Sequence, residues 1–303
     1  MALGLYPDGG QAVERYDHMI DEIADFGASD IALVVTWAQR DIRSTSIAAG
    51  KESIDDATLR HAITHARKRG LRVLVFPILT VRKLRPGQWR GTLQPADIDT
   101  WWQAYETFIL HYADIAAKSG AESLLIGSEL ATTELWMYRW YHLISQVRRV
   151  YDGSLVYSAN WDHFQLVSFW RRLDVIGVNG YFRLTDNAEA DVSTLRAAWS
   201  DQRERIADYL RDKGKAFWMT EVGYTSVDGT ATRPWDYQRK GRIDHEEQRR
   251  CFQAFTEVWD GAPELDGVFV WNWWGRGGAK DRGYTPKNKP AGKVLRNWYR
   301  GAP

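Results

Sequence analysis

Short apolar runs alternate with amphipathic stretches along the whole length of this chain. The apolar runs are brief and rich in β-branched residues, as expected of parallel strands that are buried on both faces. Such strands need a covering layer of helices, and the intervening stretches can supply it. The predicted strands cover residues 2–6, 30–36, 71–79, 122–128, 154–159, 173–179, 216–221 and 267–272.

The stretches between these runs carry apolar residues at helical spacing. Residues 11–27 place Tyr16, Ile20, Ile23 and Phe26 on one face, and this pattern predicts a helix that packs against a core. Glycines after two of the other stretches are typical of helix ends. The further predicted helices cover residues 55–69, 97–119, 134–151, 162–171, 192–213, 244–260 and 290–300.

A strand–helix unit that repeats eight times in 303 residues predicts the α/β fold known as a (β/α)8 TIM barrel. The rival fold, an open doubly wound sheet, usually has a glycine-rich phosphate-binding turn after its first strand. The corresponding segment here reads YPDGGQ and lacks that pattern. The sequence contains no evident linker, low-complexity tract or internal repeat, so we expect a single barrel domain over residues 1–303.

Charge and cysteine content exclude several classes of partner. The formal net charge of +1 gives no field that would attract nucleic acid or an anionic membrane, and no run of eighteen apolar residues could span a bilayer. The single cysteine, Cys251, cannot form an intrachain disulfide. No signal peptide is visible, which fits a cytoplasmic protein or a secreted one whose signal has been removed. The oligomeric state stays open, with a monomer favoured.

Two glutamates stand at the ends of predicted strands. Glu221 closes the apolar run AFWMTE, and Glu129 follows the run LLIGS. The carboxyl ends of barrel strands line the active site, and the fourth and seventh strands lie across the barrel from each other. Two facing carboxyl groups suit the cleavage of a glycosidic bond. One protonates the leaving oxygen, and the other attacks the anomeric carbon or activates water.

Aromatic and polar residues follow the other predicted strands. The chain has sixteen Trp and fourteen Tyr, and many Trp around a cleft suit the flat apolar faces of sugar rings. We expect Tyr181 to donate a hydrogen bond to Glu221 and keep it ionised, and Trp271 to form an apolar floor under a sugar. The other candidates for substrate binding are Trp37, Arg40, Trp89, Asn160, Trp161, Asn179 and Trp235.

The histidines give little support to metal-dependent chemistry. A metal-dependent barrel hydrolase needs several His or Asp at strand ends, and the seven His of this chain are poorly placed for it. His61 and His65 lie four residues apart on a predicted outer helix without the Glu of a zinc protease motif, and we interpret them as surface residues. The segment GSEL is also not a nucleophilic serine elbow. We therefore expect no metal and no cofactor.

Several of these segments together resemble the clan A glycoside hydrolases and, more narrowly, glycoside hydrolase family 113, which is known for β-mannanases. The matching segments are TWAQRD, QWRGTLQP, IGSEL and MTEVGYTSVDGTATRPWDY, and they lie between residues 36 and 237. The resemblance implies a retaining (β/α)8 enzyme in which Glu129 is the acid/base and Glu221 the nucleophile. Ser128 stands where the wider clan usually has an Asn that contacts the sugar 2-hydroxyl.

These observations predict a retaining β-glycoside hydrolase that acts by double displacement on a β-linked oligo- or polysaccharide, with a β-mannan as the first candidate. Two alternatives stay open. The long loops after the third and seventh strands are aromatic and basic, so the chain could hydrolyse or transglycosylate an anionic or cell-wall glycan. It could also be a barrel that binds glycans with weak catalysis, although the presence of both acids argues against this.

Overall fold

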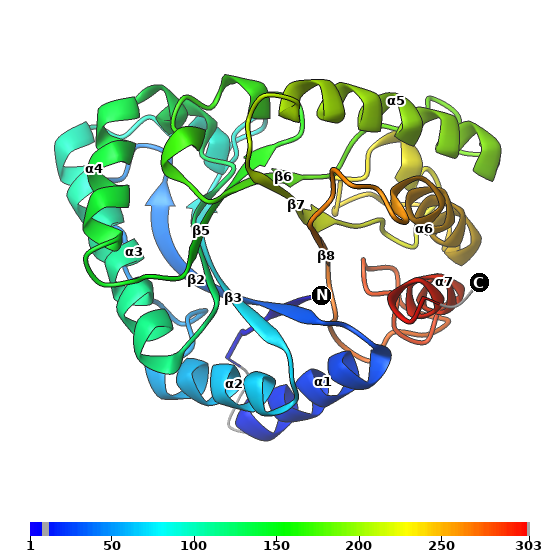
Figure 1. Cartoon of the computed structure of the whole chain (residues 1–303), viewed down its shortest axis with the longest axis horizontal. Helices are drawn as coiled ribbons and strands as arrows, with labels where there is room; N and C mark the ends of the chain where they lie inside the picture. Colours follow the sequence, from blue (N-terminus) through cyan, green and yellow to red (C-terminus); the bar gives the residue numbers. More distant parts are fainter. Residues whose placement is uncertain (8–11, 302–303) are drawn as a thin grey trace.

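Figure 1 shows the strands gathered around a central axis with the helices outside them. The structure is a computed structural model, and it describes residues 1–7 and 12–301. In this part of the chain, eight strands pair in parallel and in sequence order, which makes a (β/α)8 barrel as predicted. The strands are β1 (Ala2–Gly4), β2 (Asp30–Asp41), β3 (Arg72–Lys83), β4 (Ser123–Ser128), β5 (Ser154–Asn160), β6 (Val175–Asn179), β7 (Ala216–Val222) and β8 (Gly267–Val270).

The α-helices cover the outside of the barrel (Figure 1). Each of them lies inside a range predicted from the sequence. None of the described helices has both the length and the apolar character needed to cross a membrane. The helices are α1 (Ala12–Phe26), α2 (Asp56–Lys68), α3 (Ile98–Ser119), α4 (Met137–Val147), α5 (Val192–Leu210), α6 (His245–Trp259) and α7 (Pro290–Tyr299).

The prediction of a helix at residues 162–171 is wrong. Two short 3-10 helices, η3 (Phe164–Leu166) and η4 (Trp170–Arg172), stand between β5 and β6 instead. A helix of ten residues gains little from its own backbone hydrogen bonds, so tertiary contacts decide the conformation. Here the indole Nε1 of Trp170 donates to the Phe164 carbonyl at 2.9 Å, and both side chains are buried.

β2 and β3 run further than the sequence predicted. They stay paired in register as far as Asp41 and Lys83, beyond the predicted ends at residues 36 and 79. On the other side of the barrel, the backbone N–H of Trp273 donates to the Ala2 carbonyl at 2.8 Å. This hydrogen bond brings the chain after β8 back to β1, so the barrel is nearly closed.

Two apolar layers meet at the strands. Alternate residues of a strand point to opposite faces, so each strand contributes to both layers. In β2, Ala32 and Val34 belong to the cluster inside the barrel, whereas Ile31, Leu33 and Val35 belong to the larger cluster between barrel and helices. All four apolar residues predicted on the inner face of α1 are buried in this outer cluster.

A bulge near the end of β4 changes the direction of the chain where it leaves the barrel. Relative to β5, the strand contains one extra residue between Leu125 and Ser128. Gly127 lies in this bulge, where a Cβ atom would come within 2.9 Å of the Trp140 ring. A bulge bends its strand and re-aims the side chain that follows it, which here is Glu129.

Candidate functional site

Glu129 follows β4 directly and has an unusual backbone conformation. Its φ of 55° lies in the left-handed region, which residues other than glycine seldom adopt. The backbone N–H of Glu129 donates to the Ser158 carbonyl of β5 at 2.8 Å, and this pairing holds the conformation in place. Backbone strain of this kind gathers where a side chain must be placed for binding or chemistry. The observation marks Glu129 as a candidate functional residue.

The Glu129 carboxylate is held on both of its oxygens. Arg90, in the 3-10 helix η1 (Arg90–Thr92), donates from Nη2 to Oε2 at 2.8 Å. Asn179, the last residue of β6, donates from Nδ2 to Oε1 at 2.7 Å. The side chains of Arg90 and Glu129 are 24% and 13% exposed, so water screens their ion pair less than it screens a surface pair.

A layer of buried polar side chains fixes the orientation of Asn179. Its Oδ1 accepts hydrogen bonds from Ser158 Oγ at 2.6 Å and from Thr220 Oγ1 at 3.1 Å. The three residues come from the neighbouring strands β5, β6 and β7, and all of them are fully buried. Because two hydroxyl groups donate to Oδ1, the amide presents its NH2 group to Glu129.

Glu221 lies near the end of β7 and is only 3% exposed. After Met219 the strand shifts its register against both β6 and β8, and such a bulge re-aims the side chain that follows. The Tyr181 hydroxyl donates to Glu221 Oε2 at 2.9 Å, which confirms the hydrogen bond predicted from the sequence. Among the described residues, Oε1 of Glu221 has no hydrogen-bond partner. Tyr181 therefore holds one carboxylate oxygen, whereas the other makes no full hydrogen bond, although the nearby Asn179 side chain lowers the pKa of this carboxyl group.

Burial raises the pKa of Glu221 to about 8, well above the ordinary value for a glutamate. The charge of Glu129 raises this pKa further, whereas Arg90 and the hydrogen bond from Tyr181 lower it. The expectation that Tyr181 keeps Glu221 ionised is wrong for the free site, because desolvation outweighs the hydrogen bond. Glu221 is therefore mostly protonated near neutral pH in the free site.

We expect the Glu221→Gln variant to be more stable than the parent chain at pH 8 and to lose this advantage at acidic pH. The folded parent holds a proton on Glu221 that the unfolded chain releases above the ordinary pKa of 4.5. The parent therefore loses stability as the pH rises from 4.5 to about 8, whereas Gln does not titrate.

Thermal melts of both proteins at pH 5 and pH 8 measure this effect. The difference in melting temperature should grow between the two pH values, by roughly 2–4 °C for each kcal/mol of ionisation penalty. The same difference at both pH values would show that the Glu221 carboxyl ionises in the folded chain as easily as in the unfolded one.

Two groups of side chains in the described part of the chain could hold a metal ion, and neither contains Glu129 or Glu221. These groups are Asp17 with His61 and His65, and Asp228 with Asp244 and Glu247. In the second group, the carboxylates of Asp244 and Glu247 already accept hydrogen bonds from backbone N–H groups. Arg90 supplies a positive charge beside both Glu129 and Glu221.

The sequence model of Glycoside Hydrolase Family 113 matches residues 6–289, which is nearly the whole chain. The chain belongs to glycoside hydrolase family 113. The resemblance seen in the sequence segments is thereby confirmed, and membership of the family implies a carbohydrate substrate. The match covers Glu129, Glu221 and every candidate substrate residue from Trp37 to Trp271. A comparison with curated proteins finds no match.

Solved structures of family 113 enzymes resemble the chain over almost its whole length. A complex of a GH113 β-1,4-mannanase shares 26% sequence identity with a TM-score of 0.89, covering 99% of this chain and 97% of that chain. The GH113 β-mannanase AaManA from Alicyclobacillus acidocaldarius, in complex with ManMIm, shares 24% identity with a TM-score of 0.88, covering 99% and 96%. At 24% identity, the second likeness supports the fold alone.

Three aromatic side chains of the family 113 barrel come together after β5, β6 and β7. The rings of Trp161 and Trp235 stack, with centroids 5.5 Å apart and an interplanar angle of 26°. Phe182 meets Trp161 at 5.8 Å. Trp235 is 42% exposed, so part of this aromatic shelf is open to solvent. Two of the predicted substrate residues are thus in contact with each other.

Asn160 and Trp271 lie at the ends of β5 and β8. Asn160 pairs in register with Asn179, the residue that donates to Glu129. Trp271 is half-buried, and its ring meets Phe76 of the inner cluster at 6.4 Å, edge to face. The peptide bond that follows Trp271 is cis. Both residues therefore have the strand-end position that the sequence predicted.

Three other predicted residues make contacts that do not include either acid. The Trp37 ring packs against α3, with its centroid 5.4 Å from that of Phe108. The Arg40 side chain is 73% exposed and pairs with the adjacent Asp41. The Trp89 ring folds back over η1, the short helix that begins with Arg90. A direct role at the acids is not indicated by these contacts.

Three side chains near the acids are missing from the sequence prediction. Arg90 contacts Glu129 directly. Burial raises the pKa values of Tyr6 and Tyr284, and the nearby charge of Glu221 raises both further. The segment QWRGTLQP pointed to the loop that holds Arg90, but not to this side chain. Tyr6 ends the first predicted strand, and this position could have marked it.

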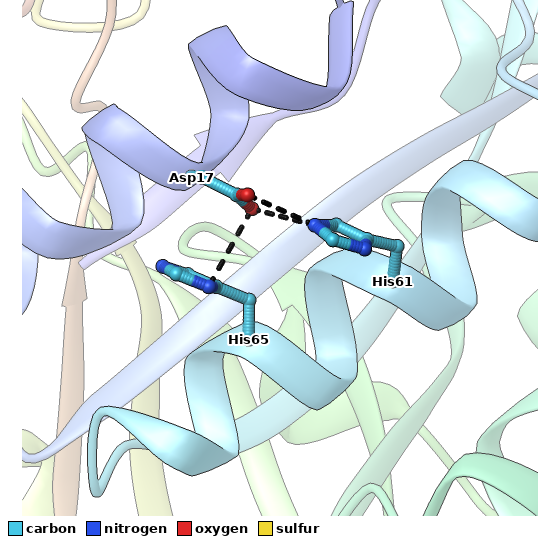
Figure 2. Close-up of side chains that lie close together, drawn as sticks. All are labelled: Asp17, His61 and His65. Atoms are coloured by element: carbon cyan, nitrogen blue, oxygen red, sulfur yellow. Dashed lines mark hydrogen bonds and ion pairs between the residues drawn. The ribbon is translucent and has the colours of Figure 1, made fainter.

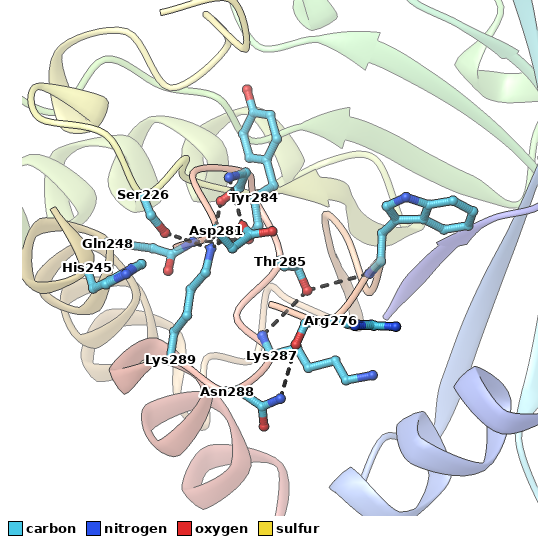
Figure 3. A network of polar contacts seen from close by, with 12 residues as sticks. Ser226, His245, Gln248, Arg276, Asp281, Tyr284, Thr285, Lys287, Asn288 and Lys289 are labelled. Carbon is cyan, nitrogen blue, oxygen red and sulfur yellow. Dashed lines mark hydrogen bonds and ion pairs between the residues drawn. The ribbon is translucent and has the colours of Figure 1, made fainter. Parts of the chain in front are cut away.

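A network of polar contacts holds the loop after β8 in place (Figure 3). At its centre is the ammonium group of Lys289, whose side chain is fully buried. It donates to Ser226 Oγ at 2.8 Å, Asp281 Oδ1 at 2.7 Å and the Gly283 carbonyl at 3.0 Å. The network fixes the backbone on both sides of Tyr284, whose ring lies 6.1 Å from that of Tyr181.

Proposed function

We propose that this family 113 chain is a retaining β-glycoside hydrolase that cleaves a β-linked mannan, with Glu129 as the acid/base and Glu221 as the nucleophile. The observation that carries the proposal is the pair of carboxyl groups at the ends of β4 and β7, close enough for the charge of one to raise the pKa of the other. The 26% identity with a solved GH113 β-1,4-mannanase supports mannan as the first substrate to test.

In the first step of this proposal, Oε1 of Glu221 attacks the anomeric carbon while Glu129 gives a proton to the leaving glycosidic oxygen. The bond from carbon to Glu221 forms as the glycosidic bond breaks. Oε1 suits this role because it lacks a partner, while Tyr181 holds Oε2. This step requires Glu129 to carry a proton and Glu221 to be ionised when substrate is bound.

In the second step, Glu129 removes a proton from water, and the water oxygen displaces Glu221 from the anomeric carbon. Arg90 and Asn179 both contact the Glu129 carboxyl group, and these contacts hold it in position for this proton transfer. Two displacements at the same carbon restore its configuration, so the proposal specifies retention.

A panel of β-linked oligosaccharides, with products identified by mass, tests the substrate class. We expect cleavage of β-1,4-linked manno-oligosaccharides. The panel should include glycans that contain uronic acids, because Arg82, Lys83 and Arg85 at and after the end of β3 are exposed and basic. If only the acidic glycans are cleaved, the substrate is an acidic glycan and not a mannan. If the chain binds these glycans but cleaves none of them, it is a glycan-binding barrel and not a hydrolase.

Replacement of Trp271 by Ala should weaken glycan binding and lower turnover, by about 10- to 100-fold in kcat/KM. A sugar that stacks on this ring would bury apolar C–H surface, which is worth roughly 25 cal/mol for each Å². The ring would also hold the anomeric carbon against Glu221. Melting curves measured beside the kinetics provide the control. If the folded fraction of the variant hydrolyses glycans at the normal rate, Trp271 is a packing residue and not a substrate platform.

A further inference from the structure

A cluster of one aspartate and two histidines lies between helices α1 and α2, outside the barrel (Figure 2). His61 Nε2 lies 2.9 Å from Asp17 Oδ1 and 3.0 Å from Oδ2, and His65 Nδ1 lies 3.7 Å from Asp17 Oδ1. The three possible ligand atoms all lie within 4.8 Å of one another. Because these residues belong to outer helices, the cluster is separate from the acids at the strand ends.

Helix geometry explains why the two histidines meet. Residues four apart on an α-helix share a face, and the rings of His61 and His65 lie 6.2 Å apart and nearly parallel, at 12°. Asp17 reaches them from the neighbouring helix α1. Its side chain and that of His65 are 28% and 23% exposed, whereas His61 is 45% exposed. The cluster is thus partly shielded but open to ions from solvent.

A second carboxylate orients one of the two imidazoles. His65 Nε2 lies 2.8 Å from Asp21 Oδ1, on the side of the ring away from Asp17. Arg69 Nε lies 3.3 Å from the same oxygen and fixes Asp21 in turn. Histidines that bind a metal usually donate their other ring N–H to a carboxylate in this way, which sets the tautomer and the ring orientation.

This tautomer leaves an unfavourable contact inside the cluster. An imidazole that donates from Nε2 carries a lone pair on Nδ1 unless it is protonated. In His65 this atom faces an oxygen of Asp17 (Figure 2). Two electron-rich atoms in this relation repel each other unless a cation is shared between them. A metal ion bound by both atoms would replace this repulsion with two coordinate bonds.

We propose that Asp17, His61 and His65 form a binding site for Zn2+ or a similar divalent transition metal, with water in the remaining position. Two imidazole nitrogens and one carboxylate suit zinc, and they do not suit the oxygen-seeking ions Mg2+ and Ca2+. Zinc bonds of about 2.0–2.2 Å place neighbouring ligand atoms about 3.3 Å apart. The present distances of 2.9 Å and 3.7 Å to Asp17 lie on either side of that value, and all three ligand atoms lie within 4.8 Å of one another.

Bound metal would clamp α1 to α2 and stabilise the first two strand–helix units. Zn2+ should bind the folded chain and raise its melting temperature, since an ion that binds the native state shifts the folding equilibrium toward it. The test uses the whole chain without an affinity tag, stripped with a chelator and titrated calorimetrically with ZnCl2. We expect one ion for each chain and a rise in melting temperature.

Single substitutions in the cluster show which side chains bind the ion. His65→Ala and Asp17→Asn should each weaken Zn2+ binding at least about tenfold, and Asp21→Asn should weaken it by about 10–100-fold through the orientation of His65. His61→Gln is a further variant. It should fold like the parent chain, because the His61 side chain is exposed. His142→Ala is the matched control, because His142 is an exposed helical histidine near Glu106 and outside the cluster.

Two results would overturn the proposal. One is the absence of Zn2+ binding by the stripped parent chain, which would make the cluster a network of ion pairs only. The other is Zn2+ binding that the His61→Gln and His65→Ala variants retain at full strength, which would place the ion elsewhere. Melting curves without metal show whether each variant folds like the parent. Glycoside hydrolysis should be unchanged in all of these variants, so the result does not depend on the proposed activity.

Discussion

The Glu221→Gln variant is expected to lose roughly 10⁴-fold or more in turnover on every glycoside substrate. Gln keeps the shape of the side chain and can still accept the hydrogen bond from Tyr181. It lacks the carboxylate charge that would attack the anomeric carbon, so no glycosyl-enzyme can form. The loss should be large for substrates with good and poor leaving groups alike, because both depart in the step in which Glu221 would attack.

Steady-state kinetics on a manno-oligosaccharide and on an activated aryl mannoside measure this loss. Glu122→Gln is a suitable control, because Glu122 lies just before β4, at the opposite end of that strand from Glu129, and pairs with Arg67. The variant should also melt at or above the parent temperature at pH 8, which separates lost chemistry from lost folding. A Glu221→Gln variant that retains a tenth of the parent turnover would exclude Glu221 as the nucleophile.

The Glu129→Ala variant is expected to discriminate between leaving groups. A poor leaving group needs the proton that Glu129 would supply, so hydrolysis of oligosaccharides should fall by about 10²–10⁴-fold. An activated aryl glycoside needs no such proton and should still form the glycosyl-enzyme. Its breakdown should then be slow, because no base remains to activate water.

Azide should restore turnover of the activated substrate by this variant. The anion needs no general base, and it can enter the space that the Glu129 side chain has left. The glycosyl azide should have the anomeric configuration of the substrate, since it arises from two displacements. Equal losses on both types of substrate, without rescue by azide, would assign Glu129 a structural role beside Arg90 and Asn179.

The barrel was predictable because its strands are apolar on both faces. Every strand and all but one of the predicted helices lie close to their predicted places, since short β-branched apolar runs differ in length and composition from the longer stretches with helical periodicity. The exception at residues 162–171 is a short segment whose conformation depends on tertiary contacts, such as the hydrogen bond from Trp170 to Phe164.

The orientation of Glu221 was not predictable from the alternation of its strand. Phe217 and Met219 belong to the outer cluster, so strict alternation would also turn Glu221 outward. The register shift after Met219 changes this, and it arises from pairing with β6 and β8, which one strand alone does not encode. The sequence signal for Glu221 was its position at a strand end, and the bulge determines the direction of its side chain.

Burial explains the other differences between prediction and structure. The depth of Glu221 decides whether the hydrogen bond from Tyr181 or desolvation controls its pKa, and depth is a property of the assembled barrel. The same holds for Arg90, which reaches Glu129 only because its loop folds over the barrel. A basic residue in a long polar loop carries no sequence signal of this contact.

The stereochemistry of the first product tests the proposed mechanism most directly. Proton NMR spectra recorded during hydrolysis of a β-1,4-linked manno-oligosaccharide show which anomer appears before mutarotation. The double displacement through Glu221 predicts that the new reducing end appears first as the β anomer. Initial release of the α anomer would mean a single displacement by water, and it would contradict a covalent intermediate on Glu221.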